Sequence, residues 1–91
     1  MSKLEVIAAA AMQLASGETV SLPPPARHHN LILHLLANGQ DRVAAFQADQ
    51  GFLTDTGRFV DRAEARRIAR RAGQIDRKTI HPLMLFSEDL W

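Results

Sequence analysis

Residues 51–65 read Gly-Phe-Leu-Thr-Asp-Thr-Gly-Arg-Phe-Val-Asp-Arg-Ala-Glu-Ala, and this stretch indicates the class of fold. Two runs suited to strands, 51–54 and 58–60, flank the sequence Asp-Thr-Gly. Glycine adopts a positive φ angle in such a turn without a steric penalty, and we expect this of Gly57. The pattern therefore predicts two antiparallel strands joined by a tight turn.

The same stretch ends in the beginning of a helix. Asp61 is a favourable N-cap residue, and Glu64 three residues later completes a pattern like a capping box. A narrow apolar stripe follows at helical spacing, and Gly73 ends the helix. The stripe consists of Ala65, Ile68, Ala69 and Ala72. Because most of these side chains are small, the helix can lie close against a sheet.

The N-terminal residues favour a β-hairpin. Residues 5–7 are strand-like, residues 16–18 form a good turn, and residues 19–22 alternate with β-branched side chains. The alternative is a helix over residues 3–15, because alanine has the highest helix propensity. The hairpin and the helix both remain open at this point.

Prolines 23–25 end the second strand, because proline lacks the N–H group that a sheet requires. Proline is well tolerated at a helix start, so we expect a helix from about Pro25 to Ala37. Its apolar residues recur at helical spacing, and Asn38-Gly39 is a typical helix end. These apolar residues are Leu31, Ile32, Leu35 and Leu36.

The remaining segments are less regular. Residues 40–50 are predicted to be a connection with a short strand at 43–46, and residues 82–85 a short final strand. Trp91 is expected to pack on its own subunit or on a neighbour. Together the elements predict a single α+β domain over residues 1–91. It has an N-terminal β-hairpin and two main helices packed on a small antiparallel sheet.

Composition narrows the classes of protein. The chain has 91 residues, of which 46% are hydrophobic and 23% charged, as in one small folded domain. No apolar run reaches the roughly 18–20 residues that span a bilayer, so we expect a cytoplasmic protein without membrane contact. The absence of cysteine excludes disulfides and thiolate metal sites. Oligomerisation would supplement the modest core.

Positive charge is concentrated in one segment. The net charge is +1, but residues 58–78 carry eight basic and three acidic side chains. Arg62, Arg66 and Arg70 share one face of the predicted helix, which is either a solvated face or a surface for an acidic partner. Nucleic-acid binding is disfavoured, because the chain is nearly neutral, lacks tyrosine and contains no recognised reading helix.

Arg27, His28 and His29 form the first candidate binding motif. They stand at a predicted helix start, where free backbone N–H groups and a partial positive charge attract anions. Three potential cations at that position are mildly unfavourable unless a negatively charged ligand offsets them. Helical spacing also places His28 beside Ile32 and Leu35, so the alternative is a buried core histidine.

The second candidate motif lies between Gly51 and Asp61. Its glycine, hydroxyl groups and arginine precede another helix start and could cradle a phosphate or a ribose. The Gly-Lys-Ser/Thr sequence of nucleotide hydrolases is absent. The alternative is a plain hairpin followed by a capped helix, with Phe52 in the core.

Enzyme and metal-site templates fit poorly. No serine lies in a Gly-x-Ser-x-Gly context. His28, His29 and His34 have a spacing that suits no metal site on a single helix. We therefore expect no catalytic residues, no metal and no cofactor.

Three motifs resemble a family of small, uncharacterised bacteriophage and prophage proteins. They are Arg-His-His at 27–29, Gly-Phe-Leu-Thr-x-x-Gly-Arg-Phe-Val-x-Arg-x-Glu-Ala at 51–65, and Ser-Glu-Asp-Leu-Trp at 87–91. The resemblance covers most of the chain beyond Val20 and favours a strand in the N-terminal segment. It implies an accessory phage protein that acts on a host process.

The resulting hypothesis is a non-catalytic phage protein that sequesters a phosphate-containing, nucleotide-like host immune signal in a homo-oligomer. The expected ligand-binding residues are Arg27, His28, His29, Gly51, Thr54, Thr56 and Arg58. The expected partner or interface residues are Arg62, Arg66, Arg70, Glu88, Asp89 and Trp91. The alternative is a protein–protein inhibitor or adaptor that binds a host protein through the arginine-rich face of the second helix.

Overall fold

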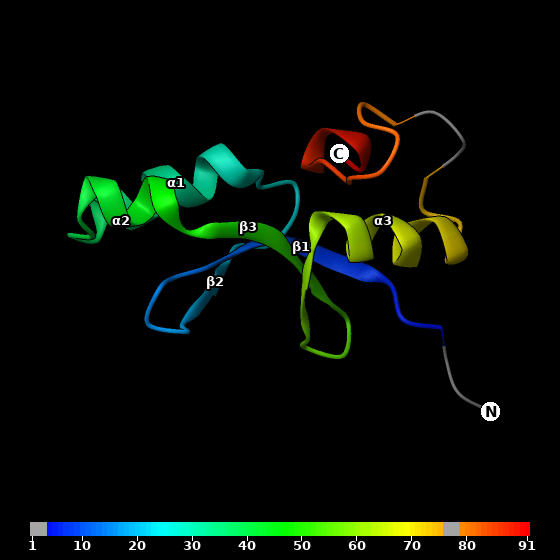
Figure 1. Cartoon of the computed structure of the whole chain (residues 1–91), viewed down its shortest axis with the longest axis horizontal. Helices are drawn as coiled ribbons and strands as arrows, with labels where there is room; N and C mark the ends of the chain where they lie inside the picture. The colour runs from blue at the N-terminus through cyan, green and yellow to red at the C-terminus, as the bar shows by residue number, and fades with distance from the viewer. Residues whose placement is uncertain (1–3, 76–78) are drawn as a thin grey trace.

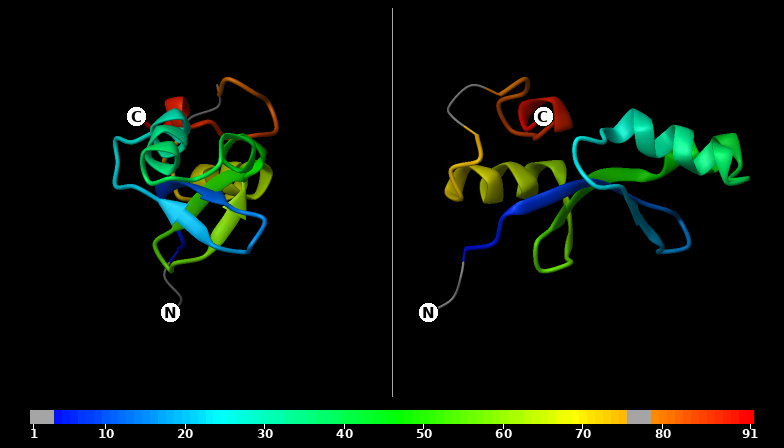
Figure 2. Two further views of the ribbon diagram at one scale, coloured as in Figure 1. Left: turned by 90° about the vertical axis from the view of Figure 1, so that its left-hand side faces the viewer. Right: turned by 180° about the vertical axis from the view of Figure 1, so that it is seen from behind.

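The computed structural model describes residues 4–75 and 79–91. Within these residues four strands form one antiparallel sheet in the order β2-β1-β3-β4. The strands are β1 (Ile7–Gln13), β2 (Thr19–Ser21), β3 (Asp49–Thr54) and β4 (Phe59–Asp61). The helices are α1 (His28–Ala37), α2 (Arg42–Gln47) and α3 (Arg62–Arg71), and the 3-10 turn η1 is Ser87–Asp89. The helices and η1 lie on one face of the sheet, and the turns of both hairpins project away from them (Figures 1 and 2).

The predicted α+β class, the N-terminal hairpin and the antiparallel sheet are confirmed. The alanine-rich segment is the central strand β1, not a helix, because it pairs with β2 on one side and β3 on the other. Ala10 and Ala11 are fully buried there. Tertiary pairing on both edges overrides the local helix propensity of alanine.

The tight turn and the helix after residue 51 form as predicted. Gly57 has a φ angle of 85°. The Asp61 side chain accepts a hydrogen bond from the Glu64 N–H at 2.8 Å and caps α3. The first main helix begins at His28 rather than at Pro25, so the three prolines precede it.

Two predicted strands are wrong. Residues 43–46 lie in the helix α2, whose N-cap Asp41 accepts a hydrogen bond from the Ala44 N–H at 3.3 Å. Residues 82–85 are not in the sheet, because this segment runs beside α3, where the Leu85 N–H donates to the Arg62 carbonyl at 2.9 Å. The apolar side chains of both segments suggest strands, but in the structure one residue of each, Ala45 and Leu85, is buried and the others are partly or fully exposed.

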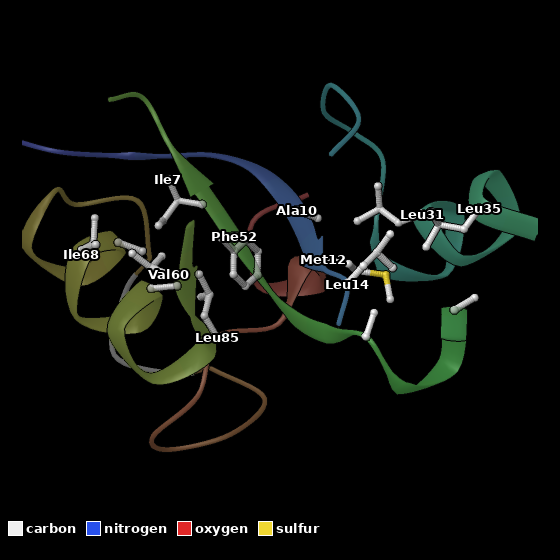
Figure 3. Packing of buried hydrophobic residues seen from close by; sticks show 14 residues of the cluster. Ile7, Ala10, Met12, Leu14, Leu31, Leu35, Phe52, Val60, Ile68 and Leu85 are labelled. Carbon is white, nitrogen blue, oxygen red and sulfur yellow. The ribbon is translucent and has the colours of Figure 1, made fainter. Parts of the chain in front are cut away.

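The core is continuous across the length of the sheet. Phe52 is fully buried and lies between two groups of side chains (Figure 3). One group packs under α3 and includes Ile7, Val60, Ile68 and Leu85; the other packs under α1 and includes Met12, Leu14, Leu31 and Leu35. Phe52 thus connects the packing beneath α1 with the packing beneath α3. Both predicted binding motifs therefore lie on elements that share one core.

Candidate functional site

Arg27 meets the last residues of the sequence at the N-terminal end of α1. Its Nε donates to the Trp91 carbonyl oxygen at 2.8 Å, and its Nη2 donates to the same oxygen. The Trp91 indole Nε1 in turn donates to the Ala26 carbonyl at 2.9 Å. Trp91 therefore packs on its own chain, which is one of the two expected alternatives, and the guanidinium of Arg27 is bonded to an oxygen acceptor.

The turn that holds Arg27 is fixed by Asn30. The Asn30 side-chain oxygen accepts a hydrogen bond from the Arg27 backbone N–H at 2.8 Å. The first turn of α1 contains no acidic residue, so its partial positive charge is not neutralised by its own side chains. The side chain of His29, next along this turn, is exposed.

His28 is a buried residue, which corrects its assignment as a phosphate ligand. Its Nε2 donates to the Gly51 carbonyl at 2.7 Å, and its ring meets Phe52 edge-on at a centroid distance of 5.1 Å. Burial lowers the pKa of His28, although the Gly51 hydrogen bond and the nearby Glu88 act in the opposite direction. The alternative that helical spacing offered, a core histidine, is the one that the structure contains.

We expect this burial to make stability depend on pH near neutrality. The unfolded chain binds a proton at His28 more readily, because the pKa falls below its ordinary value of 6.5 only in the folded state. The contribution of neutral His28 is therefore present above pH 6.5 and is lost as the pH falls through the folded pKa. Urea denaturation at several pH values should show the free energy of unfolding decreasing as the pH falls below about 6.5.

A matched pair of variants isolates this effect. His28→Gln should flatten the slope of stability against pH in this range, because no titrating group remains at the buried position. His34→Gln, which changes an exposed histidine on the same helix, should keep the slope. A slope that is unchanged in His28→Gln would contradict the assignment.

Arg62 is not on a solvated face of α3, although the sequence places it with Arg66 and Arg70. Its Nη1 donates to the Leu85 carbonyl at 2.8 Å, and its other terminal nitrogen donates to the Gln50 side chain. The guanidinium also lies 4.4 Å from the ring centroid of Phe86. Arg62 therefore fastens the C-terminal segment to α3 and β3, and burial lowers its pKa.

Glu88 and Asp89, the two acidic residues of η1, have different surroundings. A hydrogen bond from the Ser87 hydroxyl lowers the pKa of Glu88, and the charges of Arg27 and His28 contribute in the same direction. Asp89 accepts backbone hydrogen bonds from Phe86 and Ile80, both at 2.9 Å. Glu88 is thus the exposed acid near Arg27, whereas Asp89 holds the local backbone.

The second predicted motif forms a separate network around Glu5. Arg58 donates to Glu5 at 2.7 Å, and the Thr56 hydroxyl donates to the same carboxylate at 2.7 Å. Thr54 is buried and shares a hydrogen bond with Thr56 at 2.8 Å. These contacts, led by the Arg58 hydrogen bond, lower the pKa of Glu5 to about 2. No local pattern indicates this partner, because Glu5 lies 53 residues from Arg58 in the chain.

The exposed polar side chains of the two predicted binding motifs are not adjacent. The turn between β3 and β4, which carries Thr56 and Arg58, projects below the sheet in Figure 1, whereas η1 and the start of α1 lie above it. Gly51 lies between them, but its carbonyl is bonded to His28. A Cβ atom at Gly51 would also overlap the Val60 carbonyl oxygen, so this glycine serves close strand packing. One ligand is therefore not expected to contact both motifs.

The outer arginines of α3 differ in exposure. Arg66 is partly buried and donates from Nε to the Thr79 hydroxyl at 3.1 Å. Arg67 pairs with Glu64 at 2.6 Å, and both Arg70 and Arg71 are exposed. The arginine face predicted from the sequence is thus reduced to the C-terminal half of the helix.

Sequence reasoning also missed a clamp at the start of β1. The Gln74 side chain accepts from the Ile7 N–H at 2.7 Å and donates to the Ile7 carbonyl at 2.9 Å. It satisfies both backbone groups of Ile7 at a point of β1 that lies outside the pairing with β2, which covers Ala11 to Gln13. A lone glutamine after a helix-ending glycine carries no signal that would have revealed this contact.

Comparison with known proteins assigns the family. A family model described as "Phage T4 y16D protein" matches residues 6–91. The chain belongs to this family. No curated protein and no solved structure gives a significant match. The family is a phage protein family, in agreement with the resemblance seen in the three motifs.

Membership of this family indicates no particular ligand or reaction. Among residues 4–75 and 79–91 there is no group of three or more metal-ligating side chains. Within the same ranges, no helix has the length and apolar character to cross a bilayer. Of the residues predicted to bind a ligand, Arg27 is partly exposed and His29 is exposed, and both lie near the N-terminal end of α1. These two side chains are therefore the candidate ligand-binding residues of this phage protein.

Proposed function

We propose that this phage protein binds a phosphate-containing, nucleotide-like host immune signal and sequesters it without turnover. The observation that carries the proposal is the guanidinium of Arg27, which directs two donors at one oxygen at the N-terminal end of α1. Guanidinium groups and helix N-termini are both favourable partners for phosphate oxygens. The exposed His29 imidazole adds a further hydrogen-bonding group next to Arg27.

The described contacts narrow the ligand set that the sequence suggested. In this proposal the phosphate contacts Arg27 and His29, while His28 and Gly51 support the turn from below. Thr54, Thr56 and Arg58 stabilise the fold through Glu5 and are not required for binding. Glu88, exposed and near Arg27, is placed to accept a hydrogen bond from a base or a ribose.

A homo-oligomer is part of the proposal, because a signal is sequestered more tightly between two subunits than on one open surface. Exposed apolar side chains on α1 and α2 are available for such contacts. They are Leu33 and Val43. The protein would act in the host cytoplasm, where a nucleotide signal is produced. Native mass spectrometry gives the number of subunits directly.

Arg27→Ala is expected to weaken nucleotide binding by about tenfold or more, because a charge-assisted hydrogen bond is lost. The measurement is native mass spectrometry and calorimetry with a panel of nucleotides and cyclic nucleotides. Arg42→Ala, which removes an exposed arginine from α2, is the matched control and should bind as the unaltered protein does. Undiminished binding by Arg27→Ala would refute the proposed site.

Two further readouts separate binding from other outcomes. The chain has one tryptophan, so its fluorescence should change when a phosphate replaces the Trp91 carbonyl at Arg27. A denaturing mass measurement of the released ligand should recover it unaltered. Conversion of the ligand would instead favour an enzyme acting on phosphate esters.

A second candidate function is an inhibitor or adaptor that binds an acidic host protein. The observation in its favour is the exposure of Arg70 and Arg71 on the last turn of α3. Charge reversal at Arg70 should abolish this interaction and leave nucleotide binding unchanged, because Arg27 is on a different element. The two candidate functions are therefore separable in the same set of variants.

A further inference from the structure

Leu90 and Trp91 follow the 3-10 turn η1, whose own position is fixed by several contacts. Leu85, just before η1, is fully buried and is bonded to Arg62 through both its N–H and its carbonyl. Within η1, the Asp89 side chain accepts two backbone hydrogen bonds. The two residues beyond η1 therefore start from a point that is held in the fold.

Leu90 and Trp91, here called the latch, connect η1 to the N-terminal end of α1, and these two parts lie side by side in Figures 1 and 2. The N–H groups of both residues donate to the Ser87 carbonyl at 3.0 Å. Toward α1, the Trp91 carbonyl oxygen accepts from Arg27, and the Trp91 indole donates to the Ala26 carbonyl at 2.9 Å. Both latch side chains are half-buried and pack against the core.

The Trp91 oxygen occupies the hydrogen-bond donors that the proposed function assigns to a phosphate. Arg27 directs Nε and Nη2, the two donors on one edge of its guanidinium, at this single oxygen. The same pair of parallel donors is what binds two oxygens of a phosphate or a carboxylate. A phosphate on this edge of Arg27 would therefore have to displace the Trp91 oxygen.

Release of the latch would change little else in the fold. Among residues 4–75 and 79–91, the hydrogen bonds between the latch and residues before η1 are those that Trp91 makes with Arg27 and Ala26. The bonds that hold η1, including those of Asp89, do not involve the latch side chains. Glu88 would therefore keep its place near Arg27 when the latch opens.

We infer that the latch is an autoinhibitory contact, in which Trp91 blocks the anion-binding edge of Arg27 until a phosphate-containing ligand displaces it. The inference rests on the proposed function and adds a regulation of the same site. Because the latch belongs to the same chain, its oxygen competes at an effective concentration in the millimolar range. The half-buried indole favours the closed latch, since release would expose apolar surface. The apparent affinity for the ligand is therefore lowered by the fraction of molecules whose latch is open.

The single tryptophan of the chain provides a direct readout, because its indole N–H gives one signal in a heteronuclear NMR spectrum. The probe is inorganic phosphate, added to the full chain at constant pH and at an ionic strength kept constant with sodium chloride. Phosphate binding is followed at the backbone amide of His29, and the latch is followed at the indole signal. Both signals should saturate at the same phosphate concentration, with the indole signal moving toward that of N-acetyltryptophanamide in the same buffer.

Trp91→Ala tests whether the latch competes with the ligand. The variant removes the indole bond to Ala26 and the packing of the latch, but it keeps the backbone oxygen. Phosphate should bind this variant about tenfold more tightly, because the latch is open in a larger fraction of molecules. Phe46→Ala is the matched control, since it removes an exposed aromatic side chain from α2 and should leave the phosphate affinity unchanged.

Circular dichroism should confirm that each variant is folded. Leu90→Ala is a smaller change in the latch and should tighten phosphate binding by a smaller factor. It keeps the competition measurable if Trp91→Ala is not fully folded.

The outcomes separate a failure of the latch from a failure of the proposed function. Phosphate binding that leaves the indole signal in place would overturn the latch, because the ligand would then use the other edge of the Arg27 guanidinium. Equal or weaker binding by folded Trp91→Ala would also overturn the latch, although Arg27 could still be the phosphate ligand. Binding that persists in Arg27→Ala, or no binding by the unaltered protein and Trp91→Ala up to about 10 mM phosphate, would overturn the site and the latch together.

Discussion

Replacing Gly51 with alanine is expected to lower the free energy of unfolding by about 3 kcal/mol or more. A Cβ atom at this position would overlap the backbone oxygen of Val60 and would lie 2.7 Å from the Cζ of Phe59. The Phe59 ring can move, but the Val60 oxygen belongs to β4, which would have to separate from β3. The Gly51 carbonyl also accepts the His28 hydrogen bond, so the base of α1 would be disturbed as well.

Gly57→Ala is the matched control, because it adds the same methyl group to the same hairpin. Among residues 4–75 and 79–91, no atom lies within 4 Å of a Cβ at Gly57, so the φ angle of 85° is what opposes the substitution. We expect a cost of about 1 kcal/mol from that backbone conformation. Urea denaturation followed by circular dichroism measures both variants. Equal stability of the two variants would show that β3 and β4 separate without significant cost.

Phe52→Ala is expected to lower the free energy of unfolding by about 4 kcal/mol. The side chain is fully buried and lies between the packing beneath α1 and the packing beneath α3 (Figure 3). Its removal leaves a cavity at the junction and removes the edge-on contact with His28. A loss of this size is a large part of the 5–15 kcal/mol that stabilises a typical domain. We therefore expect a large fraction of unfolded protein at moderate temperature.

Phe46→Ala provides the comparison for this substitution. The same atoms are removed, but Phe46 on α2 is 58% exposed. Its change in stability should stay within about 0.5 kcal/mol. Calorimetric melting of both variants measures the difference, and similar melting temperatures would contradict the central place of Phe52 in the core.

The parts of the fold that could be predicted from the sequence are those with local causes. The turn at Gly57 and the cap at Asp61 depend on residues within a few positions of each other, and both were correct. Strand β1 was ambiguous, because its alanines favour a helix until two neighbouring strands are present. Helix α2 was missed, because six residues with one buried side chain, Ala45, carry little periodic signal.

The candidate site was predictable to a smaller extent, because its contacts join distant parts of the chain. Helical spacing correctly offered a buried His28. The sequence could not show that Arg58 pairs with Glu5, 53 residues away, or that Arg62 holds the segment at Leu85. A sequence does not distinguish an arginine that is bonded within the fold from an arginine that is available to bind a ligand. Arg27 and Arg58 are both predicted ligand residues, and in the structure each is bonded to an oxygen acceptor of its own chain.

The contact between Arg27 and Trp91 bears on when the protein can finish folding during synthesis. The two residues are 64 positions apart, and the indole contact with Ala26 spans 65 positions. Contacts of such long range form late, after the costly closure of the intervening chain. The start of α1 therefore completes these contacts only after Trp91 has left the ribosome. Until then the newly made chain exposes the residues that the completed protein covers, so a host chaperone or protease would meet it in that interval.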